Sequence, residues 1–160
     1  MPAEEKETGK DHHLLELETH LPYRLGRLTN LIRQVTTEVY IRQSGITGRE
    51  WRVLGMIGIV GHVNAREIAR LTGMDKATVT RAVNRLVTLG VVTRVSDKTD
   101  RRSKILELTN KGAALCDRII PEMKTGGEVL AEALTPEELS LFLTCLDKLT
   151  IKAEDLLADE

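Results

Sequence analysis

Two short helical segments separated by only three residues restrict the fold of this chain more than any other feature. Asn64 can cap a helix over 65–72, because its side chain can accept a hydrogen bond from the backbone N–H three residues later. The turn at 73–75 begins with glycine and ends with an aspartate cap, and an apolar stripe then predicts a second helix from Lys76 to about Thr88. Two helices joined in this way form a helix-turn-helix.

Further helices and a pair of strands are predicted around this motif. Caps, apolar spacing and glycine stops predict the following elements: a helix over 22–45, a helix over 47–61, the two helices of the motif, strands over 91–95 and 105–108, a helix from Thr109 and a helix from Thr135. Pro121 lies inside the helix from Thr109, where it predicts a kink. The expected fold class is mainly α with a small β-hairpin.

Charge is distributed unevenly along a chain whose net charge is only −1. The segment 62–111 holds 11 Lys or Arg and 5 Asp or Glu, a net charge of +6. The remaining residues hold 12 basic and 19 acidic residues, a net charge of −7. A basic centre between acidic ends is expected when only the middle of a chain meets phosphate. Accidental clustering would give the same counts, so charge alone does not decide.

The helix over 76–88 divides into an apolar face and a polar face that carries no acid. The polar side chains offer cations for phosphate, hydroxyls for phosphate or base edges, and an Arg and an Asn that can reach base edges through two hydrogen bonds. The candidate DNA-binding residues on this helix are Lys76, Thr78, Thr80, Arg81, Asn84 and Arg85. For a helix considered alone, the solvated face of an ordinary amphipathic helix is the alternative.

A charged loop over 96–103 lies between the two predicted strands. Lys98, Arg101 and Arg102 repel one another there, and they become favourable beside DNA, where displaced counterions drive binding and narrow grooves attract arginine. Asp100 would repel DNA if it acted alone, so we expect it to pair with Arg102 and to fix the shape of the loop. A helix-turn-helix followed directly by such a ribbon is the winged-helix arrangement.

Three stretches carry a resemblance to MarR-type winged-helix transcriptional regulators: "ITGREWRVL" over 46–54, "AREIARLTGMDKATVTRAVNRLVTLGVVTR" over 65–94 and "DRRSKILELTNKG" over 100–112. The resemblance implies a homodimer that binds double-stranded DNA at a pseudo-palindromic operator. It places Thr78, Thr80 and Arg81 in the major groove, and Arg102 in the minor groove with Asp100 holding it. Lys76, Asn84 and Arg85 are added from the helical wheel alone.

Regulators of this family commonly bind small aromatic or phenolic acids between the dimer helices and the DNA-binding lobe. An arginine near that junction would suit a carboxylate through bidentate pairing. The candidate effector-binding residues are Tyr23, Arg24, Arg27, Trp51, Ile57 and His62. Arg24 and Arg27 could equally be solvated or bridge the dimer, and Trp51 could belong to the core. The expected function is a repressor that a small-molecule effector releases from DNA.

The long helices at the two ends of the chain carry apolar stripes outside the compact centre. Two copies could bury these stripes by isologous packing, although the helices could also pack on their own domain. The chain is therefore divided into four parts: a mobile tail over 1–13, an N-terminal dimerisation helix region over 14–45, a winged helix-turn-helix DNA-binding domain over 46–111, and C-terminal dimerisation helices over 112–160.

The sequence indicates neither a membrane protein nor a secreted protein nor an enzyme. It has no apolar run long enough to span a bilayer and no apolar signal core, so a cytoplasmic location is expected. No metal-ligand spacing and no phosphate-cradling loop appear, so no cofactor and no metal are expected. Cys116 and Cys145 are interpreted as small apolar residues, with a disulfide or redox pair as the alternative. Thiol sensing by a first-helix cysteine is not expected, since 22–44 contains none.

The alternative function is a winged-helix protein-interaction module that never touches DNA. Such a module would use the charged loop to bind an acidic protein. The uncharged-to-basic face over 78–85 favours DNA, because it suits base edges better than a carboxylate-rich partner.

Overall fold

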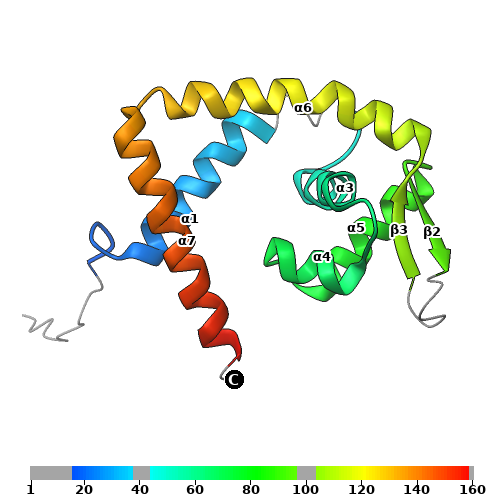
Figure 1. Ribbon diagram of the computed structural model, residues 1–160, viewed down its shortest axis with the longest axis horizontal. Coiled ribbons are helices and arrows are strands. Elements are labelled where there is room, and N and C mark those ends of the chain that lie inside the picture. The colour runs from blue at the N-terminus through cyan, green and yellow to red at the C-terminus, as the bar shows by residue number, and fades with distance from the viewer. Residues whose placement is uncertain (1–15, 38–43, 97–103, 159–160) are drawn as a thin grey trace, which may run out of the picture.

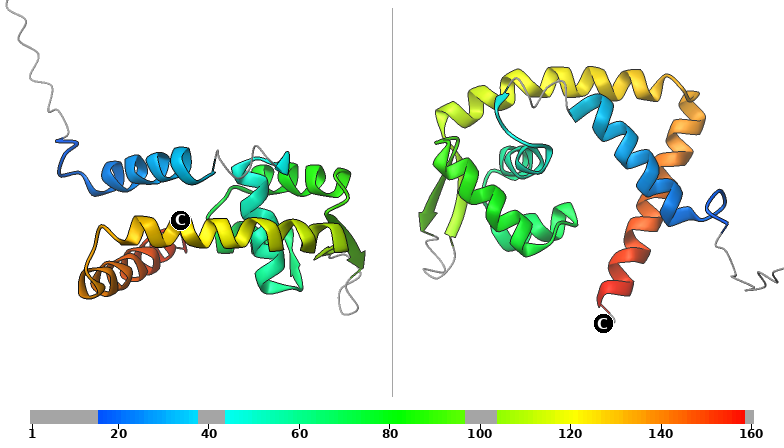
Figure 2. Two further views of the ribbon diagram at one scale, coloured as in Figure 1. Left: turned by 90° about the horizontal axis from the view of Figure 1, so that it is seen from above. Right: turned by 180° about the vertical axis from the view of Figure 1, so that it is seen from behind.

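The computed structural model describes residues 16–37, 44–96 and 104–158. Figure 1 shows two groups of elements that one long helix connects. Helix α1 (Leu21–Ile32) and helix α7 (Pro136–Ala158) lie on one side, and the helices and strands between residues 48 and 108 lie on the other. Helix α6 (Asn110–Ala131) reaches from the strands to α7. The views from above and from behind in Figure 2 show the same separation.

The N-terminal helix changes its winding within the predicted range of 22–45. The α-helix ends at Ile32 and continues as a π-helical turn, η1 (Arg33–Thr37), and Ser44 is again helical. Val35 lies in this turn, and a β-branched side chain loses χ1 freedom in an α-helix, which favours a change of winding here. Residues 38–43 of the predicted helix, which include the apolar Val39, lie outside the described residues.

Helix α3 (Gly48–Val60) begins with the predicted capping box. Thr47 N donates to Glu50 Oε2 at 2.6 Å, and Glu50 N donates to Thr47 Oγ1 at 3.3 Å. Two N–H groups at the start of the helix are therefore satisfied reciprocally. The helix ends before Gly61, whose φ of 78° lies in the region that favours glycine, so the prediction for both ends is confirmed.

Helices α4 (Ala65–Thr72) and α5 (Lys76–Thr88) form the predicted helix-turn-helix. The caps Asn64 and Asp75 each accept a hydrogen bond from the backbone N–H three residues later, at 2.9 Å and 2.8 Å. Gly73 takes a left-handed φ of 63° between the two helices. A side chain at that position would be strained, so the glycine allows the turn to be this short.

A small antiparallel sheet follows, with the strand order β1-β3-β2. Strands β2 (Val92–Ser96) and β3 (Lys104–Leu108) form the predicted hairpin, in which Arg94 lies opposite Leu106. Strand β1 (Val63–Asn64) pairs with the other edge of β3 and is an addition to the predicted elements. Two residues are too few to give a periodic signal, so sequence reasoning missed this strand.

The first turn of α6 is anchored to the end of α5. Thr109 Oγ1 accepts from Gly112 N at 3.1 Å, as the predicted cap should, and donates to Gly90 O at 2.8 Å. Lys111 Nζ donates to Leu89 O at 2.8 Å. The start of α6 is thus fixed to the two residues that follow α5.

Helix α6 is continuous over 22 residues. It passes Pro121 and the two glycines at 126 and 127 without ending, so Pro121 lies inside the helix as the sequence analysis expects. Thr135 then forms a capping box with Glu138, with N···O distances of 2.9 Å and 3.2 Å, and α7 begins where the sequence predicts.

The hydrophobic core lies among α3, α4, α5, the sheet and the first half of α6. Its largest completely enclosed side chains are Leu54, Ile57, Ile68, Leu86 and Leu106. Helices α1 and α7 fall entirely within the described ranges, and none of their residues is buried. The apolar stripes of the two end helices therefore lie outside the core, as expected. In the described parts of the chain, no helix has the length and apolar character needed to cross a bilayer.

Candidate nucleic-acid interface

The predicted DNA-contacting residues of α5 lie on its outward face. Val79, Ala82, Val83 and Leu86 are buried and hold the other face of the helix against the core. Thr78 is half-buried at the boundary, and the remaining five predicted residues are exposed. This division follows from helical spacing, because residues three and four apart share a face. The helix contains no acidic residue, so the exposed face carries only cations and neutral polar groups.

The first turn of α5 holds Arg81 in a hydrogen-bonded chain. The Arg81 guanidinium donates to Thr78 Oγ1 at 2.9 Å, and Thr78 N donates to Asp75 Oδ1 at 2.8 Å. Hydrogen bonds from Thr78 and then the charge of Arg81 lower the pKa of the Asp75 carboxyl. Thr78 therefore links the cap of the helix to the arginine that the resemblance places in the major groove.

The hydroxyl of Thr80 is left with only acceptor capacity. Thr80 Oγ1 donates its hydrogen to Lys76 O at 2.8 Å, within the helix. The oxygen lone pairs remain free to accept, and the amino groups of adenine and cytosine are the donors in the major groove. Phosphate oxygens cannot donate, so in this arrangement Thr80 suits a base edge.

Asn84 contacts an arginine that sequence reasoning did not select. Arg94, at the centre of β2, donates from its guanidinium to Asn84 Oδ1, and both side chains are exposed. The two residues are ten positions apart and belong to a helix and a strand. Neither helical nor strand periodicity relates them, so the pair could not be found from one sequence.

The charged loop that the sequence analysis singles out lies outside the described residues. Its four predicted contact residues are Lys98, Asp100, Arg101 and Arg102. The described strands end at Ser96 and Lys104, and Lys104 Nζ donates to Ser96 Oγ at 3.0 Å. The hairpin thus fixes the two points between which the charged loop runs.

A second cationic feature lies beside the first turn of α5. Arg33 from η1, together with Arg49 and Arg52 from α3, lines one cleft with the turn at 73–75 and Thr78. Partial burial lowers the pKa of Arg52, and the charges of Arg33 and Arg49 lower it further. The carboxylate of Asp75 lines the same cleft, so three guanidinium groups share it with one acid and leave it with an excess of positive charge. The sequence analysis missed these arginines because they come from segments far apart in the chain.

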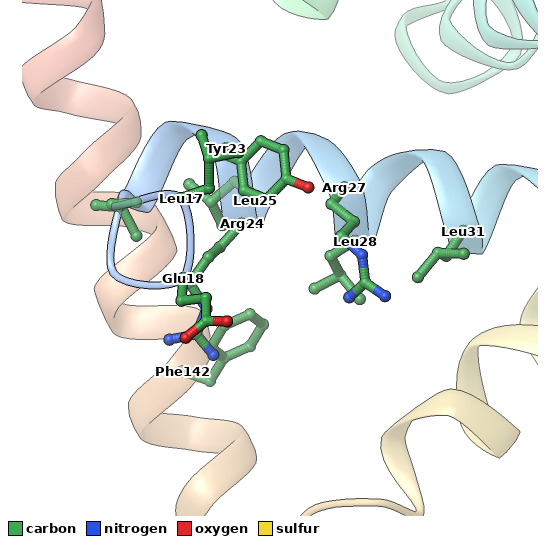
Figure 3. A pocket seen from close by; sticks show the side chains of 10 residues that line it. Leu17, Glu18, Tyr23, Arg24, Leu25, Arg27, Leu28, Leu31 and Phe142 are labelled. Carbon is green, nitrogen blue, oxygen red and sulfur yellow. The ribbon is translucent and has the colours of Figure 1, made fainter. Parts of the chain in front are cut away.

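Three of the six predicted effector-binding residues lie together. Tyr23, Arg24 and Arg27 line a groove along α1, and the rest of its lining is leucines of the same helix, Phe142 of α7, and Leu17 and the acidic Glu18 from the segment before α1. Figure 3 shows these side chains projecting from α1, with Phe142 on the neighbouring helix. The groove combines guanidinium groups with apolar and aromatic surface.

The other three predicted effector-binding residues lie in the group of elements that contains the core. Trp51 is half-buried against the core, and Ile57 is completely enclosed in it. His62 Nδ1 lies 3.9 Å from Glu107 Oε1 at the surface. The helical spacing of α3 puts Ile57 on the same buried side as Val53, which explains why it lines no groove.

Cys116 and Cys145 are both free thiols, so the disulfide alternative is not realised. Cys116 is buried in α6, where burial and then the neighbouring Asp117 raise the pKa of its thiol. A thiol with a raised pKa is a poor nucleophile at neutral pH, as expected for a small core residue. Cys145 is exposed on α7 and departs from that interpretation.

The fold and this surface define a class of protein. A helix-turn-helix whose second helix presents an acid-free polar face, followed by a two-stranded ribbon, is a winged helix-turn-helix that binds DNA. The sequence profile of the MarR family matches residues 44–103. The HTH-type transcriptional repressor NicR of Pseudomonas putida is 30% identical over 129 residues, which are 79% of this chain and 82% of NicR. The chain belongs to the MarR family of transcriptional regulators, which are not enzymes.

Solved structures share the fold. A mutant MarR of Escherichia coli complexed with operator DNA is 27% identical, with a TM-score of 0.67 and coverage of 79% of this chain and 93% of that chain. A MarR/EmrR family regulator of Acinetobacter sp. ADP1 is 22% identical, with a TM-score of 0.82 and coverage of 88% and 99%. The operator complex supports DNA binding in this family.

Proposed function

We propose that this protein is a sequence-specific transcriptional repressor that binds a pseudo-palindromic operator as a homodimer and leaves it when an aromatic or phenolic acid binds. The observation that carries this proposal is the acid-free outward face of α5 beside the hairpin. Thr78, Thr80 and Arg81 enter the major groove in this account. Arg102 enters the adjacent minor groove, and Asp100 orients it.

The homodimer is supported by the exposed apolar side chains of α1 and α7. Leu21, Leu28 and Leu31 each expose between 41% and 47% of their surface, and Leu141 and Ile151 expose 65% and 59%. Removing such surface from water stabilises a complex by roughly 25 cal/mol per Å² before the cost of association. A dimer of this kind would set the two α5 helices about 34 Å apart, one turn of DNA.

The proposed effector site is the groove along α1. Its volume of about 830 Å³ lies in the range of small-molecule sites. Arg24 and Arg27 offer a carboxylate two guanidinium groups, and Tyr23 and Phe142 offer aromatic surface. Because α1 is also a proposed dimerisation helix, an effector there would favour a different angle between the two copies and a spacing of α5 that misfits the operator.

The test is selection of bound fragments from genomic DNA, followed by fluorescence anisotropy on a selected duplex. We expect Arg81→Ala to weaken binding by about 1–3 kcal/mol and to relax base preference, and Arg102→Ala to weaken binding as well. Lys148→Ala, which removes an exposed cation of α7, should bind like the wild type. Unchanged affinity in both arginine variants would contradict the proposal.

The test also addresses the alternative, a winged-helix module that binds an acidic protein. Such a module would bind no duplex at low ionic strength, where electrostatic DNA binding is strongest. The acceptor-only hydroxyl of Thr80 argues against it, since a carboxylate partner offers no donor to that group.

A further inference from the structure

Asn84 and Arg94 form an exposed polar pair where α5 and the hairpin meet. Asn84 lies one helical turn after Thr80 on the outward face of α5, and Arg94 reaches it from β2. Within the described residues no carboxylate forms an ion pair with Arg94, so its positive charge is not neutralised there. The pair is therefore cationic and open to solvent.

The hydrogen bond between the two side chains decides which atoms they present. A guanidinium has five N–H donors and no acceptor, so only the carbonyl oxygen of Asn84 can face Arg94. Among the described residues, the Asn84 amide nitrogen and the remaining N–H groups of Arg94 have no further hydrogen-bond partner, and all of them are donors. A bidentate adenine contact needs the oxygen and nitrogen of asparagine side by side on the base. Here that oxygen is turned toward Arg94, so the pair suits a ligand that only accepts.

The position of the pair favours the DNA backbone over a base. Asn84 lies eight residues after Lys76, which is about 12 Å along the helix axis at 1.5 Å per residue. The residues of a recognition helix that reach base edges are those near its N-terminus. A ligand touched by both side chains also lies between the helix and the hairpin, at the edge of the groove that α5 enters.

We propose that Asn84 and Arg94 together clamp one phosphate of the DNA backbone at the edge of the groove that α5 enters. This inference rests on the proposed DNA binding through α5. A phosphate offers acceptor oxygens and a negative charge, which match a donor-only pair that carries the charge of a guanidinium group. The clamp positions the protein on the duplex and reads no base.

Three variants separate the charge of the clamp from its hydrogen bonds. Arg94→Gln removes the charge, Arg94→Lys keeps the charge without the planar fork, and Asn84→Ala removes the partner. The matched control is Arg118→Gln, because Arg118 is an exposed arginine of α6, outside the proposed DNA-contacting elements. The probes are two duplexes of equal length, one selected by the wild-type protein from a random pool and one with the same bases scrambled.

Binding of each variant is measured by anisotropy over a series of salt concentrations. We expect Arg94→Gln to weaken binding about tenfold on both duplexes and to reduce the slope of log affinity against log salt by about 1.8, which is about 0.9 for the one phosphate contact of each copy in the proposed dimer. Arg94→Lys should keep the wild-type slope with a smaller loss of affinity. Asn84→Ala should weaken both duplexes by the same factor, and Arg118→Gln should match the wild type.

Two results would overturn the clamp. One is a wild-type slope for Arg94→Gln, and the other is an Asn84→Ala loss confined to duplexes with adenine at one position. A wild-type protein that binds neither duplex at low salt would overturn the proposed function itself, and the clamp with it. Thermal unfolding followed by circular dichroism checks the fold, and the melting temperatures should stay at the wild-type value because both side chains are exposed.

Discussion

Replacing Gly112 by alanine should strongly destabilise the protein, although it adds a single methyl group. Gly112 is buried in the first turn of α6. A Cβ atom at this position would lie 2.0 Å from Val91 O, 3.0 Å from the Val91 carbonyl carbon and 3.4 Å from a methyl of Leu108. The nearest atom belongs to the backbone, so no side chain can rotate away to make room.

The size of the effect follows from the displacement that the methyl group demands. Non-bonded atoms pack at about 3.5 Å, whereas the added Cβ would lie 2.0 Å from Val91 O, so α6 and Val91 must move apart by about 1.5 Å. Overpacking of this kind costs about 1–3 kcal/mol. Val91 O also accepts from Thr109 N at 3.1 Å, and losing a buried hydrogen bond adds about 1 kcal/mol. We expect a loss of about 2–4 kcal/mol, a large part of the 5–15 kcal/mol typical of a folded domain.

The matched control is Gly127→Ala in the same helix. Gly127 is exposed, and a Cβ there would meet nothing within 4 Å. Alanine is favoured over glycine inside a helix by about 1 kcal/mol, so this variant should be more stable than the wild type. The same chemical change in one helix is therefore expected to have opposite signs at the two positions.

Urea unfolding followed by circular dichroism measures both variants. All three proteins are compared at one protomer concentration, because a dimer gains stability with concentration. In thermal unfolding followed by the same signal, the melting temperature of Gly112→Ala should lie about 4–16 °C below that of the wild type, because each kcal/mol lowers it by about 2–4 °C in a chain of this size. A free energy of unfolding within 1 kcal/mol of the wild type for Gly112→Ala would refute the reasoning from this close approach.

Two further variants test the cap of α5 and the dimer. The hydrogen bonds from Thr78 lower the pKa of the Asp75 carboxyl below its ordinary value of 3.8. The ionised carboxyl therefore stabilises the folded protein above about pH 4, and this stabilisation is lost as the pH falls through the pKa that Asp75 has in the folded protein. When the pH is lowered to about 3, the urea concentration at the unfolding midpoint should therefore fall more for the wild type than for Asp75→Asn. Asparagine caps a helix but has no titrating group. Equal decreases in the two midpoints would contradict this account. Leu28→Glu places a charge in the proposed dimer face and should give a monomer by light scattering, whereas Asn30→Glu on the other side of α1 should stay dimeric. A dimeric Leu28→Glu would count against that face.

Local chemistry made the starts of the helices predictable. Thr47, Asn64, Asp75 and Thr109 each accept a hydrogen bond from a backbone N–H three residues later. All the atoms involved lie within one turn, so the sequence contains the whole interaction. The outward face of α5 was predictable for the same reason, because helical spacing alone separates it from the buried stripe.

Contacts between distant segments were not predictable. The pairing of Val63 with Leu106 depends on how β1 meets β3, and the contact of Arg94 with Asn84 depends on where β2 leaves α5. Ile57 was predicted to bind the effector because it lies near the junction of the two lobes, but it lies on the face of α3 that is buried in the core. Residue spacing in the sequence describes one helix or strand at a time, whereas these contacts depend on how two elements pack against each other.

The anchoring of α6 to the end of α5 has a mechanical consequence. Thr109 and Lys111 hold the first turn of α6 to Gly90 and Leu89, so α5 follows any movement of that turn. The 22 residues of α6 make a rod about 33 Å long. A pivot of about 5° at the α7 end of such a rod sweeps its other end through about 3 Å, close to the 3.4 Å between successive base pairs. With this length and anchoring, a slight tilt at one end of the helix would give a shift of about one base-pair step at the other.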